Sequence, residues 1–185
     1  MQISSLEALK TIIKPTHKSY VEVGVSRAKN LVAVANTFDN LDILYGIDPY
    51  KPYIDRMVGL SEVGEKLIIT IKNEALININ NCKNKHKIKL IIDTSENIVN
   101  QFEDNSLDVV FIDTVVDEEE YKNQIVTWFK KVKRKGVLCG HDWHIKKVKD
   151  ITLELLKNLG EDHRHRGYTN KWQESNGIIW YITKL

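Results

Sequence analysis

Short apolar runs rich in Val and Ile alternate along the chain with longer segments whose charged residues recur at helical spacing. This pattern predicts strands that are each followed by a helix, the repeat that builds a parallel sheet covered by helices. The expected strands cover residues 19–24, 42–47, 88–92, 107–113 and 134–139. The run 107–113 is apolar at nearly every position, as a central strand buried on both faces should be. The pattern therefore predicts an α/β fold.

Two later segments are less regular. Residues 64–81 carry apolar side chains at roughly helical steps around a β-branched centre, so we expect a helix, with a strand as the alternative. Near the end, residues 162–169 and 177–183 both have the pattern of strands, and polar residues 170–176 separate them, which predicts an antiparallel hairpin. No repeat or change of composition marks a boundary, so residues 1–185 are expected to form a single domain.

Composition excludes several classes of function. The chain has 27 Lys and Arg against 25 Asp and Glu, and this net charge of +2 does not favour general binding of nucleic acid. Charges interrupt every apolar run before the roughly 18 residues that a membrane span needs. The first ten residues lack the pattern of a signal peptide, and Cys82 and Cys139 lack the spacing of a disulfide framework or zinc site. We therefore expect a cytoplasmic protein without membrane partners.

Polar residues follow the predicted strands, where ligands bind in open α/β sheets. Gly24 ends the first strand just before a helix, and its missing side chain lets the backbone approach a ligand closely. Asp48 ends the second strand and could bind the vicinal hydroxyls of a ribose. Asp93 and Ser95 follow the third strand. Each has an ordinary alternative, since glycine and aspartate are common in turns, and Asp or Ser often caps a helix.

A second group of polar residues follows the fourth and fifth predicted strands. Asp113 and Asp142 end these strands, which we expect to be neighbours, and His141 and His144 lie beside Asp142 in the sequence. Two carboxylates with an imidazole or water would suit a divalent cation such as Mg²⁺ or Mn²⁺. A histidine near a strand end is also often a hydrogen-bonded structural residue.

Five motifs in order resemble those of the class I S-adenosylmethionine-dependent methyltransferases. They are Glu22-Val23-Gly24, Gly46-Ile47-Asp48-Pro49, Asp93-Thr94-Ser95, Asp108-Val109-Val110-Phe111-Ile112-Asp113 and Gly140-His141-Asp142-Trp143. The chain is most similar to the small branch with the signatures E-x-G-x-x-x-G-x-S, G-I-D, D-x-S, D-x-V-F-I-D-G-x-H-x-Y and G-G-x-x-x-G-H-D-Y. The resemblance spans about residues 19–144. It implies a Rossmann-like fold with a seven-stranded, mostly parallel sheet and a C-terminal antiparallel hairpin.

The resemblance also implies a binding site for S-adenosylmethionine. The residues at the matching positions are Glu22, Gly24, Ser26, Asp48, Asp93, Thr94, Ser95 and Asp113. The first three would lie beside the methionine part of the cofactor, and Asp48 would bind the ribose hydroxyls. The segment from Asp93 to Ser95 would flank the adenine, and Asp113 would lie beside the sulfonium.

In metal-dependent O-methyltransferases of similar architecture, acidic residues at the ends of the fourth and fifth strands bind a divalent ion. Asp113 and Asp142 occupy these places and would hold Mg²⁺ or Mn²⁺ beside the acceptor hydroxyl. His144, or His141, would take the proton from that hydroxyl. The implied reaction is O-methylation of a small molecule, and relatives suggest a sugar as the acceptor.

The sequence departs from the branch pattern in three motifs. The second glycine is replaced by Ala28, the Gly, His and Tyr after Asp113 are replaced by Thr114, Val116 and Glu118, and the G-G pair before the fifth strand is reduced to Lys135-Gly136. A module of the same fold that binds a cofactor or a partner without turnover is therefore one alternative. An NAD-dependent oxidoreductase is another, although its G-x-G-x-x-G motif is absent. The motifs leave open the acceptor, which the variable residues 51–62 would contact, and leave open whether the chain forms a homo-oligomer.

Overall fold

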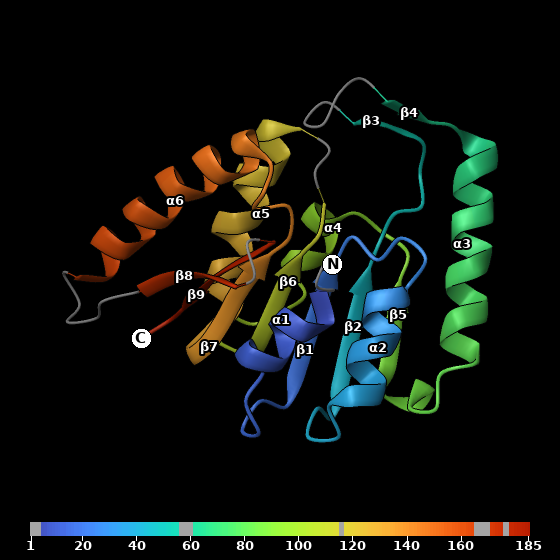
Figure 1. Cartoon of the computed structure of the whole chain (residues 1–185), viewed down its shortest axis with the longest axis horizontal. Helices are drawn as coiled ribbons and strands as arrows, with labels where there is room; N and C mark the ends of the chain where they lie inside the picture. The colour runs from blue at the N-terminus through green and yellow to red at the C-terminus, as the bar shows by residue number, and fades with distance from the viewer. Residues whose placement is uncertain (1–4, 56–60, 115–116, 165–170, 176–177) are drawn as a thin grey trace.

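The computed structural model describes residues 5–55, 61–114, 117–164, 171–175 and 178–185. The main sheet has the strand order β5-β2-β1-β6-β7-β9-β8 (Figure 1). Its strands are β1 (Ser19–Val23), β2 (Ile43–Ile47), β5 (Ile88–Ile91), β6 (Leu107–Ile112), β7 (Val132–Gly140), β8 (Lys171–Ser175) and β9 (Ile179–Thr183). A separate antiparallel pair is formed by β3 (Tyr53–Asp55) and β4 (Ser61–Val63).

Helices cover both faces of the sheet. They are α1 (Ser5–Ile12), α2 (Lys29–Thr37), α3 (Glu65–Asn80), α4 (Ser95–Val99), α5 (Glu118–Lys131) and α6 (Lys146–Arg164), with a short 3-10 turn at Lys85–Lys87. Alternate residues of β6 point to opposite faces, as the two-residue period of a strand requires. Val109 and Phe111 pack with α1, α2 and α3, whereas Val110 and Ile112 pack with α4, α5 and α6.

The order of the parallel strands extends to both sides of β1. The chain passes from β1 to β2 and β5, then crosses back to β6, which pairs with β1 on its other side. The strand order therefore reverses between β1 and β6, and the carboxyl ends of these two strands are where an open α/β sheet forms a binding crevice.

The α/β class, the mostly parallel sheet and the C-terminal antiparallel pair are confirmed. The expected parallel strands lie within two residues of the observed ones, and residues 65–80 form the expected helix rather than a strand. The pair β3–β4 was not predicted. None of the helices in the described residues has the length and apolar character that a membrane span requires.

The strand predicted over residues 162–169 is wrong in position. Residues 162–164 are the last turn of α6, 165–170 lie outside the described residues, and the strand that pairs with β9 is Lys171–Ser175. The helix continues because its apolar residues keep a helical period, with Val148, Ile151 and Leu155 facing the core. This period outweighs the strand pattern of residues 162–169.

The C-terminal segment is held to the core by a buried cation. The Lys184 ammonium group donates to the carbonyl oxygens of Val132 at 2.7 Å, Phe129 at 3.1 Å and Lys130 at 3.3 Å, and to Asn105 Oδ1 at 2.8 Å. Lys184 is only 8% exposed. It therefore satisfies carbonyl groups at the end of α5, where the helix dipole also favours a positive charge.

We expect Lys184→Met to lower the free energy of unfolding by about 2–3 kcal/mol, because it leaves these buried carbonyls without a donor. Urea denaturation of the two proteins measures the difference. Lys130→Met, at an exposed side chain of the same region, should change stability by less than about 0.5 kcal/mol. Equal losses in the two variants would show that Lys184 has no special structural role.

Candidate functional site

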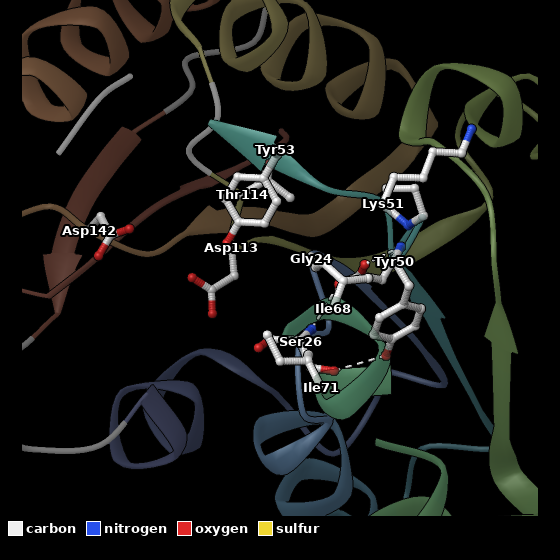
Figure 2. Close-up of a pocket in the computed structure, with 12 residues that line it drawn as sticks. Gly24, Ser26, Tyr50, Lys51, Tyr53, Ile68, Ile71, Asp113, Thr114 and Asp142 are labelled. Atoms are coloured by element: carbon white, nitrogen blue, oxygen red, sulfur yellow. Dashed lines mark hydrogen bonds between the residues drawn. The ribbon is translucent and has the colours of Figure 1, made fainter. Parts of the chain in front are cut away.

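A cavity of about 240 Å³ lies where the strand order reverses (Figure 2). Its wall is built from the loops after β1, β2, β6 and β7 and from one face of α3. The lining residues are Gly24, Ser26, Asp48, Pro49, Tyr50, Lys51, Tyr53, Ile68, Ile71, Asp113, Thr114 and Asp142. Carboxyl groups, aromatic rings and aliphatic side chains thus all contribute to the lining.

Gly24 allows the loops after β1 and β6 to touch. It has a φ of +88°, and a Cβ at this position would collide with the carbonyl oxygen of Asp113 and lie 2.5 Å from Thr114 Cγ2. Its own N–H donates to the carbonyl of Ile47 at 2.9 Å. A side chain here would therefore push apart the two strand ends that frame the cavity.

Asp48 holds the loop after β1. Its Oδ2 accepts hydrogen bonds from the backbone N–H groups of Val25 at 3.0 Å and Ser26 at 2.8 Å, and its Oδ1 accepts one from the N–H of Tyr50 at 2.8 Å. Burial raises the pKa of the Asp48 carboxyl, and these three N–H donors oppose the rise. One carboxylate therefore fastens the β1 loop to the β2 loop.

Tyr50 adds a second connection between these loops. Its hydroxyl donates to the carbonyl oxygen of Ser26 at 2.9 Å, and its ring is buried. Ser26 and Ala28 have left-handed backbone conformations, with φ of 47° and 57°. Such conformations are unfavourable for residues with a side chain, so the contacts from Asp48 and Tyr50 stabilise a strained loop.

Glu22 lies beneath the cavity rather than in its lining. The side chain is 1% exposed, and its Oε2 accepts hydrogen bonds from the Tyr20 hydroxyl at 2.9 Å and from Asn30 Nδ2 at 2.7 Å. Burial, with a further contribution from the charge of Asp113, raises the pKa of Glu22 to about 8. A positive group in the cavity would favour its ionised form.

Asp113, His141 and Asp142 form a cluster at the ends of β6 and β7. Each residue offers a ligand atom, and these atoms all lie within 4.8 Å of one another. His141 Nδ1 is 2.8 Å from Asp142 Oδ1 and 3.6 Å from Asp113 Oδ1. The expectation that Asp113 and Asp142 converge is therefore confirmed in the geometry, with His141 between them.

The protonation of this cluster follows from burial and mutual charge. Burial raises the pKa of Asp113 to about 6, with Asp142 adding to the rise and His141 opposing it. Burial alone would lower the pKa of His141, but the hydrogen bond to Asp142 and the charges of both carboxyl groups raise it overall. Two carboxylates and an imidazole fit a divalent cation, and the nitrogen donor favours Mn²⁺ over Mg²⁺.

His144 lies outside the cavity. Its side chain is exposed, and its ring centroid is 6.4 Å from that of His141. Asp142 has a φ of 60°, which breaks the strand geometry, and the next residue, Trp143, is buried against α6. The imidazole beside the carboxyl groups is thus that of His141.

The segment after β5 has local hydrogen bonds and does not line the cavity. Thr94 caps α4, because its side chain accepts from the N–H of Asn97. Asp93 Oδ1 accepts from the Thr94 N–H at 2.7 Å and from Asn97 Nδ2 at 2.8 Å. The buried Ser95 hydroxyl accepts from Trp128 Nε1 at 2.7 Å. The geometry of this segment is therefore that of a helix cap. The segment lies beside Asp48, because β5 pairs with β2.

Several cavity residues were missed from the sequence. Tyr50 follows Asp48 in a segment without a regular period, so its direction could not be derived, and Tyr53 was expected only as one of the variable residues 51–62. Ile68 and Ile71 lie three residues apart on the predicted helix, which indicates a shared face but not that the face lines a cavity.

The family model for the methyltransferase domain matches residues 21–143. The chain belongs to the methyltransferase family. The matched segment begins in β1 and ends just after β7, so it contains the loops that frame the cavity. The family implies S-adenosylmethionine as the methyl donor. None of the curated proteins matches the chain in sequence.

Several solved structures have the same fold. A candidate rRNA methylase from Clostridium thermocellum matches with a TM-score of 0.68 and 14% identity, over 100% of this chain and 98% of that one. A candidate caffeoyl-CoA O-methyltransferase from Staphylococcus aureus matches with a TM-score of 0.62 and 16% identity, over 100% of this chain and 94% of that one. The cofactor-bound Rv0187 from MTB matches with a TM-score of 0.63 and 10% identity, over 98% of this chain and 80% of that one. At identities this low, the similarity shows that the fold is shared and nothing more.

The departures from the methyltransferase motifs have different structural outcomes. Ala28 is fully buried in a left-handed conformation, so alanine takes the place of glycine at the cost of strain. Val116 lies outside the described residues. Glu118 begins α5, and its Oε1 is 2.7 Å from the Lys122 ammonium, in an ion pair along the helix surface.

Glu22→Gln tests the electrostatics beneath the cavity of this methyltransferase. The pKa of Glu22 in the folded protein lies above its ordinary value of 4.5. The free energy of unfolding therefore falls as pH rises from about 4.5 to 8, because the unfolded chain loses this proton first. Because Gln imitates the protonated acid, the variant should gain about 3 kcal/mol over the wild type between pH 5 and pH 8.

Urea denaturation across this pH range measures the gain. Glu103→Gln, which makes the same change at an exposed glutamate, is the control for the loss of one negative charge. A difference between Glu22→Gln and the wild type that stays constant across this pH range would contradict the raised pKa of Glu22.

Proposed function

We propose that this methyltransferase transfers the methyl group of S-adenosylmethionine to a hydroxyl of a small molecule. The observation that carries the proposal is the cavity at the strand switch, into which Ser26, Asp48 and Asp113 all face. The proposal takes residues 1–185 as one domain. Free, buried Cys82 and Cys139 support a reducing cytoplasm as its compartment.

In this proposal the Asp48 carboxylate contacts the ribose. Its two oxygens offer about four acceptor positions, and three are taken by the N–H groups of Val25, Ser26 and Tyr50. One position on Oδ1 is left for a hydroxyl. We therefore propose a single ribose hydrogen bond at Asp48 instead of the pair that the sequence suggested.

The charge of the cavity suits a cationic cofactor. Asp113 lies in the wall and Glu22 lies beneath it, and burial raises the pKa of both carboxyl groups, with a further rise from the charge of Asp142 at Asp113 and from the charge of Asp113 at Glu22. A sulfonium beside them would relieve this repulsion. The bound cofactor supplies an activated methyl group, so the protein has to align the acceptor and hold it in place. Glu22, Gly24 and Ser26 remain the residues proposed for its methionine part.

We propose that the segment from Asp93 to Ser95 lies on the adenine side of the site. Its side chains are engaged in capping and in the bond to Trp128. We therefore propose that contact with the adenine is made through the backbone and through Ile92, which is 48% exposed at the same strand end.

A divalent cation at Asp113, His141 and Asp142 would orient the acceptor hydroxyl and lower its pKa. His141 is placed to bind this cation or to accept the proton, and His144 is too far outside the cavity to do so without a movement of the loop. A sugar with adjacent hydroxyls is the acceptor class to screen first, with Mg²⁺ and Mn²⁺.

The alternative of a cofactor-binding module without turnover rests on Glu118, which faces Lys122 on the surface where the branch pattern has a tyrosine. Such a module would bind the adenosyl ligand and show no transfer with any acceptor. The family match favours a methyltransferase over an NAD-dependent oxidoreductase.

Calorimetric titration with S-adenosylhomocysteine tests the cofactor site. Gly24→Ala should weaken binding at least tenfold, about 1.4 kcal/mol, because the added Cβ forces the loops after β1 and β6 apart. Gly64→Ala is the matched control, because a Cβ there meets no atom within 4 Å. Asp48→Ala should also weaken binding, through the loss of the loop contacts and of the ribose acceptor.

The same titration with NAD separates the two enzyme classes. Folded wild-type protein that binds neither S-adenosylmethionine nor S-adenosylhomocysteine would contradict the proposal. Binding of NAD alone would favour the oxidoreductase.

The cation site is tested by titration with Mn²⁺ followed by electron paramagnetic resonance. Asp142→Asn should weaken Mn²⁺ binding about tenfold or more, since one charged ligand is lost, while affinity for S-adenosylhomocysteine changes little. Asp39→Asn, at an exposed carboxylate on another part of the surface, should bind Mn²⁺ like the wild type. Equal Mn²⁺ binding by the wild type and Asp142→Asn would exclude this site.

A further inference from the structure

Gln124 is a polar residue on the buried face of α5. Tyr121, Ile125, Trp128 and Phe129 of this face pack into the core, and Gln124 lies among them with only 2% of its surface exposed. A buried amide is costly unless its oxygen and its nitrogen both have hydrogen-bond partners. The partners of Gln124 therefore indicate what a polar side chain does at this position.

Both ends of the Gln124 amide are engaged. Nε2 donates to Glu120 Oε1 at 3.1 Å, and Oε1 accepts a hydrogen bond from the Thr114 hydroxyl. Because the carboxylate of Glu120 accepts and does not donate, it fixes which end of the amide faces Thr114. Glu120 itself is held in the first turn of α5, where its N–H donates to Asp117 Oδ1 at 2.9 Å. We call the chain Glu120–Gln124–Thr114 the Gln124 bridge, and it joins α5 to the loop after β6.

The Thr114 side chain has a second contact, through its methyl group. A Cβ at Gly24 would lie 2.5 Å from Thr114 Cγ2, so this methyl fills the space next to the glycine. Both residues line the cavity, together with Asp113 (Figure 2). A threonine side chain has few staggered positions, and the bond to Gln124 selects the one that places the methyl on Gly24. The branch pattern has a glycine after Asp113, so the methyl is an addition to the wall in this chain.

The wall at Gly24 and Thr114 belongs to the part of the cavity proposed for the methionine part of the cofactor. A methyl group there presents an apolar surface, which suits the methylene groups of that part. Another position of the Thr114 side chain would turn its hydroxyl away and leave the buried Oε1 of Gln124 without a donor. We propose that Gln124 is a positioning residue for cofactor binding, which holds the Thr114 methyl where the methylene chain of S-adenosylmethionine packs. This role rests on the proposed function, because that function supplies the ligand of the wall.

Calorimetric titration with S-adenosylhomocysteine tests the Gln124 bridge in a double-mutant cycle. Gln124→Met keeps the length of the side chain and removes both hydrogen bonds, and Thr114→Val keeps the branched shape without the hydroxyl. Each change should weaken binding about fivefold, the effect of about one lost hydrogen bond. Because both changes break the same bond, the double variant should also lose about fivefold, whereas independent effects would multiply to about 25-fold.

A second pair of changes tests whether Glu120 orients the amide. Gln124→Glu keeps an oxygen for the Thr114 hydroxyl but sets a second carboxylate against Glu120, so it should weaken binding. Adding Glu120→Gln supplies an N–H donor for the new carboxylate and should restore nearly wild-type affinity, which would not follow from a general loosening of α5. A pair that stays weak would contradict the orientation of the amide by Glu120. Thr127→Val is the matched control for Thr114→Val, because the Thr127 hydroxyl donates to the Asn123 carbonyl within α5 at 2.7 Å, and it should bind like the wild type.

Nuclear magnetic resonance reports the orientation of Thr114 without any ligand. The wild type should show a nuclear Overhauser contact between the Thr114 methyl and the α protons of Gly24, and Gln124→Met should lose it. A contact that persists in Gln124→Met, an affinity of this variant for S-adenosylhomocysteine equal to that of the wild type, or additive losses in the double variant would each overturn the proposal. A wild type that shows the contact and binds no S-adenosylhomocysteine would contradict the proposed function, and with it the ligand of the wall, while the Gln124 bridge itself would stand.

Discussion

The carboxylate of Asp48 is the contact on which the cavity depends. It accepts three backbone N–H groups from two loops, and it thereby holds the strained turn after β1 against the segment after β2. Tyr50 strengthens the same connection from its hydroxyl to Ser26. Gly24 brings this assembly against the end of β6, because its missing side chain allows contact with Asp113. The cavity is therefore a product of loop packing at the strand switch, and the sheet supplies its fixed frame.

The acidic groups around this frame explain what it can bind. Glu22 and Asp113 are held where burial disfavours their charged forms, and His141 bridges Asp113 and Asp142 at the open side. In the proposed function, Glu22 and Asp113 would face the sulfonium of the cofactor, and the cluster around His141 would hold the divalent cation.

Much of this architecture could be predicted from the sequence, because strand ends converge by topology alone. The positions of Gly24, Asp48, Asp113 and Asp142 follow from counting strands in a parallel sheet. His141 was not distinguished from His144, since the left-handed φ of Asp142 ends the alternation of side chains that would have told them apart. The role of Tyr50 and the position of β8 depend on irregular turns and on where a helix stops, and neither has a periodic signal.

The most direct test of the account is a crystal structure of the protein with S-adenosylhomocysteine. The account predicts the ligand in the cavity between the β1 loop and Asp113, with one ribose hydroxyl on Asp48 Oδ1 and the sulfur on the side of Asp113. A ligand bound at another place on the protein, or a ribose with no contact to Asp48, would contradict it.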